Sequence, residues 1–263
     1  MDLHAFSSVS ALDQQLQHYL RITTTRDRDV ERVGPFLATF DPHSSNPYLN
    51  YAIPDDDAGP SAAEVAALEE PFRRRGLPPR LEFLPAAAPA LEAALLARGF
   101  TAEGRLAVMT CAAGEAVDLA PAPGIAIAMP KTEDDLRGMR AAQHAAFGAG
   151  AGVDEGSVRR LRDSLLAGAL ALLARDEATG AIVGGGVATV PAAGVTEVAG
   201  IGVLESHRRR GIAGAITAGL ARAAFAAGHH TVWLTPGHAD AHRVYGRAGF
   251  VDRTTMLHMV KPG

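Results

Sequence analysis

Apolar residues recur at two spacings in the second half of the chain, and the change between the two spacings predicts a series of strands and helices. Short apolar runs between turn residues are typical of strands, whereas apolar residues three and four positions apart are typical of helices. From residue 125 onward the predicted order is β-α-α-β-β-β-α-β-α-β. In that order the predicted elements cover residues 125–128, 132–147, 158–166, 169–174, 181–190, 196–203, 212–227, 231–234, 239–248 and 254–260.

A stretch rich in proline and glycine separates this series from the first half of the chain. Residues 114–124 contain two of each and show no apolar period, which is typical of a linker. We therefore expect a first domain at 1–115, a linker at 116–123 and a second domain at 124–263.

The two halves share features at a constant offset of 150 residues. Gly99-Phe100 corresponds to Gly249-Phe250, and Met109 corresponds to Met259. Two short predicted strands that each feed a loop and a helix have the same offset. This agreement predicts two diverged copies of one fold. The alternative is a pair of unrelated α/β segments that both end in a Gly-Phe turn.

Composition and charge narrow the classes of function. Hydrophobic residues make up 48% of the chain, enough to build a sizeable core. The net charge of -4 argues against a nucleic-acid partner, because proteins that bind nucleic acid are usually basic. The single cysteine, Cys111, allows no intramolecular disulfide and suggests a reducing compartment. With no signal-peptide pattern and no apolar run of about 18 residues, we expect a cytoplasmic protein without a membrane partner.

The segment 208–213, Arg-Arg-Arg-Gly-Ile-Ala, has the chemistry of an anion-binding loop. It lies between a predicted strand and a predicted helix, and the start of a helix presents unpaired N–H groups with a partial positive charge. Gly211 and Ala213 would let a phosphate approach the backbone, and the arginines add charge. The segment therefore predicts a pyrophosphate-binding loop.

This loop resembles the Gln/Arg-x-x-Gly-x-Gly/Ala signature of the GNAT superfamily of N-acetyltransferases, filled here by Arg208, Gly211 and Ala213. Glu205 stands where the family often has proline. The resemblance implies an α/β (α+β) protein of two GNAT-like domains, each with a central mixed, mostly antiparallel sheet flanked by helices. It also implies acetyl-CoA as co-substrate and no metal.

The family strand before this loop splays from its neighbour and pairs with the pantetheine arm of the cofactor. Gly200 and Gly202 fit such a bulged strand, although they would also fit a poorly packed one. The resemblance thus implies a set of cofactor-binding residues: Ile201, Gly202, Val203, Arg208, Arg209, Arg210, Gly211, Ile212, Ala213 and His238.

Tyr245 is the candidate general acid, because a phenol is protonated at neutral pH and can donate to a leaving thiolate. It resembles the tyrosine of the GNAT closing motif Asn-x-x-Ala-x-x-x-Tyr-x-x-x-Gly-Phe, which matches at Ala241, Gly249 and Phe250. His238 occupies the asparagine position, which puts a hydrogen bond to the cofactor in doubt. The alternative is a core residue on an apolar helix stripe.

Glu197 is the candidate general base, since GNAT enzymes often carry a carboxylate on this strand that acts directly or through water. A glutamate with an ordinary pKa is a poor base for an ammonium group, so the role needs a raised pKa. The alternative is an exposed strand residue. His238 and His242 are spaced like a zinc pair, but Ala239 replaces the glutamate of that motif, so no metal is expected.

The first half lacks the residues that carry this chemistry. At the 150-residue offset, the loop 205–213 corresponds to 55–63, which begins with three aspartates, and Tyr245 corresponds to Leu95. The aspartates would repel a pyrophosphate, and attraction of a cationic amine is an alternative role for them. We expect a degenerate GNAT-like domain.

The leading hypothesis is an acyl-CoA-dependent N-acyltransferase that moves an acetyl group to a small-molecule primary amine by direct attack. The alternative is a non-catalytic module that binds or senses acyl-CoA. The identity of the amine and the existence of a homodimer stay open.

Overall fold

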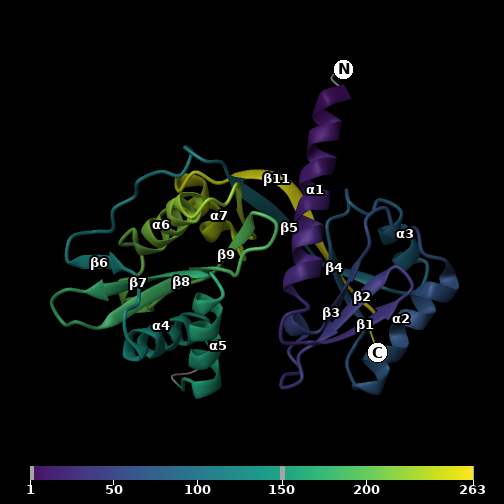
Figure 1. Ribbon diagram of the computed structural model, residues 1–263, viewed down its shortest axis with the longest axis horizontal. Helices are drawn as coiled ribbons and strands as arrows, with labels where there is room; N and C mark the ends of the chain where they lie inside the picture. Colours follow the sequence, from purple (N-terminus) through teal and green to yellow (C-terminus); the bar gives the residue numbers. More distant parts are fainter. Residues whose placement is uncertain (1–2, 149–151, 263) are drawn as a thin grey trace. The chain divides into compact units, whose positions relative to one another are not determined.

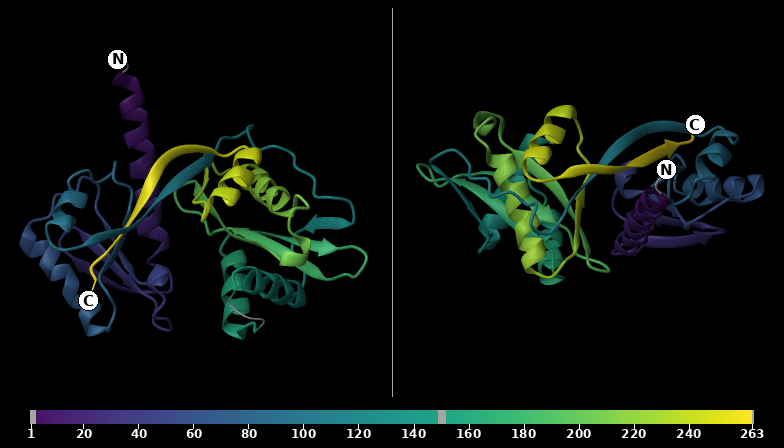
Figure 2. Two further views of the ribbon diagram at one scale, coloured as in Figure 1. Left: turned by 180° about the vertical axis from the view of Figure 1, so that it is seen from behind. Right: turned by 90° about the horizontal axis from the view of Figure 1, so that it is seen from above.

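The computed structural model describes residues 3–148 and 152–262 and divides into two compact units (Figures 1 and 2). The first unit comprises Met1–Val108 and Arg253–Gly263, and the second comprises Met109–Asp252. In the described ranges, no helix is both long enough and apolar enough to cross a membrane.

The first unit is a sheet in the order β1-β2-β3-β4-β11 with helices on its apolar face. Its strands pair antiparallel except β3 and β4, which are parallel and share one registered pair, Ala52 with Leu81. Buried residues of α2 and α3, among them Leu68, Phe72 and Leu91, pack on this face. The elements are α1 (Leu3–Thr23), β1 (Asp29–Val33), β2 (Phe36–Phe40), a 3-10 turn (Pro47–Leu49), β3 (Tyr51–Pro54), α2 (Ala62–Arg74), β4 (Arg80–Phe83), α3 (Leu91–Leu96) and β5 (Thr101–Cys111).

The second unit is a sheet in the order β5-β10-β9-β8-β7-β6, antiparallel except for β9 and β10. The observed order of elements from residue 125 is the predicted one, and the mixed, mostly antiparallel sheet flanked by helices confirms the expected fold class. The elements are β6 (Ile125–Ala128), α4 (Glu133–Ala146), α5 (Glu155–Leu166), β7 (Leu170–Asp176), β8 (Ile182–Ala188), β9 (Val195–Val203), a 3-10 turn (Glu205–His207), α6 (Ile212–Ala226), β10 (Thr231–Leu234), α7 (Ala239–Arg247) and β11 (Val251–Val260).

Most predicted boundaries in this half agree with the structure to within two residues, and two elements begin three residues earlier than predicted. Helix α5 begins at Glu155, about one turn before the predicted start, because the Asp154 side chain accepts the N–H groups of Gly156 and Ser157 and caps the helix there. Strand β11 begins at Val251, directly after the turn at Gly249, rather than at residue 254.

Helices α4 and α6 cover opposite faces of the second sheet, as Figure 1 shows. Gly185 and Gly186 on β8 reveal this arrangement, because neighbouring strand residues point to opposite faces. A Cβ atom on Gly185 would meet Met139 of α4, and one on Gly186 would meet Ile216 of α6. The glycines therefore allow both helices to pack closely on the central strand.

Each sheet is completed by a strand from the other half of the sequence. Met109–Cys111, at the end of β5, pairs with β10 in the second unit, whereas residues 257–260 of β11 pair with β4 in the first unit. The units therefore divide at 108/109 and 252/253, which differs from the expected domains 1–115 and 124–263. The expected division followed composition, while strand pairing is set by contacts distant in sequence.

Candidate functional site

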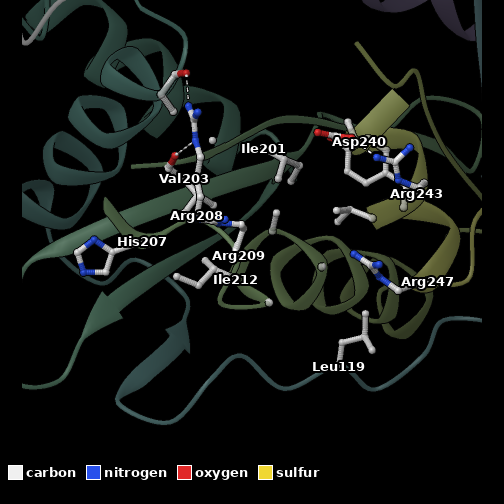
Figure 3. A pocket seen from close by; sticks show the side chains of 18 of the residues that line it. Leu119, Ile201, Val203, His207, Arg208, Arg209, Ile212, Asp240, Arg243 and Arg247 are labelled. Carbon is white, nitrogen blue, oxygen red and sulfur yellow. Dashed lines mark hydrogen bonds and ion pairs between the residues drawn. The ribbon is translucent and has the colours of Figure 1, made fainter. Parts of the chain in front are cut away.

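A cavity of about 1000 Å³ lies within the second unit, where the end of β9, the start of α6 and the helix α7 meet (Figure 3). The end of α4 and the segment before β6 complete its wall through Phe147, Leu119 and Ala120. The predicted cofactor residues that line the cavity are Ile201, Gly202, Val203, Arg208, Arg209, Gly211, Ile212, Ala213 and His238.

The start of α6 opens into this cavity without a side-chain cap. Gly211 is the N-cap residue, with φ 73°, and no side chain accepts the first N–H groups of the helix. A left-handed φ strains residues that carry a Cβ atom, so glycine suits this position. Ile212, Ala213 and Gly214 follow along the cavity wall. The loop therefore presents N–H groups and the positive end of a helix dipole to the cavity.

The three arginines of the loop have different surroundings. Figure 3 shows the Arg208 side chain directed toward α4, and it donates to the carbonyl oxygens of Val203 at the end of β9 (3.4 Å) and of Ala146 at the end of α4 (3.3 Å). Arg209 has φ 62° and lines the cavity. Arg210 does not line it and donates to the carbonyl of Pro123 at 3.3 Å. Arg208 and Arg210 thus tie the loop to its neighbours.

Strand β9 carries a bulge beside the cavity, as the glycine pattern predicts. The register with β8 shifts by one residue between the pairs Gly185–Gly202 and Val187–Ala199, and Gly200 has φ 63°. The carbonyl of Gly200 accepts a hydrogen bond of 2.7 Å from Nε2 of Gln143, whose side chain is buried. The bulge is therefore held by α4.

Strand β9 also separates from its parallel neighbour β10, and the separation begins before the bulge. The two strands share three registered pairs, from Thr231–Val195 to Trp233–Glu197. After Glu197, β9 continues for six residues without a registered pair in β10. Ile201, Gly202 and Val203 line the cavity in this stretch, where Gly202 and Val203 pair with β8 and not with β10.

Tyr245 and His238 bring α7 to the same cavity. Burial raises the pKa of Tyr245 above its ordinary value near 10, so the phenol keeps its proton at neutral pH. His238 is the N-cap of α7, and its Nδ1 accepts the N–H of Ala241 at 3.2 Å. Histidine thus fills the asparagine position as a helix cap.

Glu197 does not line the cavity. It is half-buried on β9, upstream of the bulge, and its main chain exchanges hydrogen bonds with Thr189, where the Glu197 N–H donates to Oγ1 at 3.2 Å and the Glu197 carbonyl accepts at 2.8 Å. Its role as a base stays a prediction.

Sequence reasoning missed several residues of the cavity wall. Arg243 and Arg247 line it from α7, with Asp240 paired to Arg243, and Leu119 lines it from the expected linker (Figure 3). For the two arginines the sequence did carry a signal, because Arg243 and Arg247 are four residues apart and share a helix face. For Leu119 the sequence held no signal. In the part of the chain that the structure describes, no cluster of three His, Cys, Asp or Glu could hold a metal ion.

Comparison with known proteins points to one family. Residues 138–250 match the model of the Acetyltransferase (GNAT) family. The chain is similar to a GCN5-related N-acetyltransferase from Kribbella flavida, at 26% identity and a TM-score of 0.79, over 96% of both chains. A GCN5-related N-acetyltransferase from Sphaerobacter thermophilus is similar at 17% identity and a TM-score of 0.70, over 98% of this chain and 93% of that one.

A tandem GNAT protein from the clavulanic acid biosynthesis pathway is similar at 14% identity and a TM-score of 0.63, over 92% of this chain and 86% of that one. No curated protein matches the chain. The Sphaerobacter structure and the tandem GNAT structure show the fold alone. The family match covers residues 138–250, within the second unit, and proteins of the GNAT family typically use acetyl-CoA.

Proposed function

We propose that the protein is an acetyl-CoA-dependent N-acetyltransferase that acts on a small-molecule primary amine by direct attack. One observation carries the proposal: a single cavity is lined by the uncapped start of α6 and by the protonated Tyr245. The first feature suits a pyrophosphate, and the second suits a general acid.

The cavity wall fits the successive parts of the donor. The N–H groups that follow Gly211 would hold the pyrophosphate, with Arg209 adding charge. The main chain of Ile201–Val203, which has no registered partner in β10, would hold the pantetheine arm. Bound acetyl-CoA supplies an electrophilic thioester carbonyl and a thiolate leaving group.

Two residues of the chain would donate and accept the protons of the acetyl transfer. Tyr245 would donate its phenolic proton as the thiolate leaves, which spares the site an unstable anion. Glu197 would take the proton of the attacking amine, directly or through water. Cys111 has no part in this mechanism, because its pKa is raised to about 11 and it lies outside the cavity wall.

We also propose that the first unit is a diverged copy of the same fold. Helix α2 begins at Ala62 and α6 at Ile212, and β5 and β11 begin at Thr101 and Val251. Both pairs have the offset of 150 residues found in the sequence. The positions that would bind a cofactor in this copy are used for contacts within the unit.

Two measurements test the proposed function. Calorimetry with acetyl-CoA should give one binding site per chain, and a panel of primary amines should release free thiol from acetyl-CoA. Binding without turnover of any amine would favour a sensing module instead. Failure to bind acetyl-CoA would contradict both the proposed enzyme and the sensing module.

A further inference from the structure

Arg140 of α4 is a cation without an acidic partner. Its Nη1 donates to Oε1 of Gln143 at 3.2 Å, and its Nε is shielded from solvent with no hydrogen-bond partner among the residues that the structure describes. Another cation, Arg160 of α5, acts on Arg140 and itself pairs with Asp154 at 3.6 Å. Among residues 3–148 and 152–262, no carboxylate forms an ion pair with Arg140. The stretch between these ranges, Ala-Gly-Ala, has no acidic side chain.

This arrangement is unfavourable unless something else supplies a negative charge. Shielded charges in proteins are normally paired, because removing them from water is costly. Burial lowers the pKa of Arg140, and the charge of Arg160 lowers it further. Arg137, one turn earlier on the same helix, is more exposed and yet has three acidic partners: Glu133, Asp134 and Glu155. Acidic side chains of α4 and α5 thus pair with Arg137, and none in the described ranges pairs with Arg140.

Arg140 is connected to the site by hydrogen bonds. Its partner Gln143 donates to the carbonyl of Gly200 in the β9 bulge, and Ile201, the next residue, lines the cavity. Ala146, on the same helix, also lines the cavity, and the helical rise places it ~9 Å farther along the axis. Arg140 itself does not line the cavity, and its guanidinium lies beside the bulge, linked to it through Gln143.

We propose that Arg140 binds an anionic group of the acceptor, so that the acceptor is a primary amine that also carries a carboxylate or a phosphate. The guanidinium fork matches both groups, and either one would supply the missing charge. This inference rests on the proposed function, because it names the substrate class of the same site.

The first test compares matched acceptors that differ in the anionic group. Glycine is paired with methylamine, and phosphoethanolamine with ethanolamine, so that the two pairs separate carboxylate from phosphate. The wild type should favour the anionic member of one pair. Arg140→Gln should lower kcat/KM for that member by ~10- to 100-fold, leave the neutral member unchanged and leave the Kd of acetyl-CoA unchanged. Arg140→Lys should restore part of the loss.

Arg159→Gln is the matched control, because Arg159 is an exposed arginine on α5 and its loss changes the net charge equally. It should not alter the preference. An equal loss for anionic and neutral acceptors in Arg140→Gln, or a wild-type preference for the neutral members, would overturn the proposal.

The second test does not depend on turnover. Succinate or inorganic phosphate should raise the Tm of the wild type, and Arg140→Gln should abolish that rise. Without added anion, Arg140→Gln should keep or raise the Tm, because the substitution removes an unpaired cation. A lower Tm in the variant would show a structural role, and equal stabilisation of both proteins by the anions would show binding elsewhere. Either result contradicts the proposed role of Arg140. If the wild type does not bind acetyl-CoA, that result contradicts only the proposed function.

Discussion

The two units each contain a pair of parallel strands that separate after a short contact, but the space beyond the strands is used differently. In the second unit, β9 and β10 separate after Glu197 and Trp233, and the end of β9 lines a cavity. In the first unit, β3 and β4 share the pair Ala52–Leu81, and Gln17 of α1 then bridges them. Its Nε2 donates to the Pro54 carbonyl at 3.4 Å, and its Oε1 accepts the Leu84 N–H at 3.1 Å.

The loops that follow β3 and β9 also differ, because the charged residues after β3 pair with arginines of the first unit. Asp56 forms an ion pair with Arg21 of α1 at 2.8 Å, and Asp55 pairs with Arg32. The alternative role of these aspartates, attraction of a cationic amine, is therefore in competition with partners inside the chain. Strand separation alone therefore does not make a ligand site. In the first unit, α1 supplies the polar contacts that we propose a cofactor makes in the second.

The largest effect on kcat is expected at Tyr245, and none is expected at Leu95, which lies 150 residues earlier in the chain. Tyr245→Phe removes the proposed acid and should lower kcat by ~100-fold or more, while the Kd of acetyl-CoA stays unchanged. Leu95 is fully buried, so Leu95→Ala should cost ~2–5 kcal/mol of unfolding free energy and leave kcat of the folded protein unchanged. Steady-state kinetics and urea unfolding check both variants.

The pH dependence sharpens this test. Burial raises the pKa of Tyr245, and the acid acts in its protonated form, so the contribution is present at neutral pH and lost only as pH rises through the raised value. The wild type should therefore show no tyrosine-dependent loss of kcat below pH ~10. A kcat of Tyr245→Phe close to that of the wild type would contradict the assignment.

A smaller effect is expected from the glycine that begins α6. Gly211→Ala places a Cβ atom on a left-handed residue, at a cost of ~1–2 kcal/mol, and the loop relieves this strain by moving its N–H groups. We expect acetyl-CoA to bind about 10-fold more weakly. Gly228→Ala is the matched control, since Gly228 has φ 90° and open space around it at the other end of α6. Equal binding by both variants would separate the loop from the cofactor.

The bridge in the first unit should affect stability and not binding. Gln17→Leu leaves the N–H of Leu84 unpaired in a buried place, which should cost ~1–3 kcal/mol of unfolding free energy. Gln14→Leu makes the same change at a half-buried position of α1 and should cost less. Urea unfolding measures both, and calorimetry should show an unchanged Kd for acetyl-CoA. A second acetyl-CoA bound by Gln17→Leu would mean that the first unit retains a cofactor site.

The smallest effect concerns Cys111, which pairs with Val232 in the second sheet. Burial, together with the nearby charge of Glu115, raises its pKa to about 11. Alkylation by iodoacetamide at pH 8 should therefore be slower than that of an exposed cysteine by on the order of 100-fold. Labelling followed through increasing urea reports when the second sheet opens. Rapid labelling of the native protein would contradict the burial of this strand end.

Local chemistry made much of the second unit predictable. The strand and helix periods in this half follow from residues close in sequence, as does the helix start at Thr132, whose side chain accepts the N–H of Asp135. The bulge was readable because Gly200 tolerates a left-handed backbone. The residues of the cavity wall could be predicted only in part, because Phe147, Arg243 and Leu119 come from three separate segments that meet after folding.

The order of elements in the second half, the basic loop at 208–213 and the acidic segment at 55–63 follow from the sequence alone. These features depend on the spacing and type of neighbouring residues. Only the tertiary structure decided which sheet receives β5 and β11, and that Gln17 bridges β3 and β4. Both strands are exposed in their first residues and largely buried in their last ones, and their pairing depends on contacts between residues far apart in the chain, which no local pattern records.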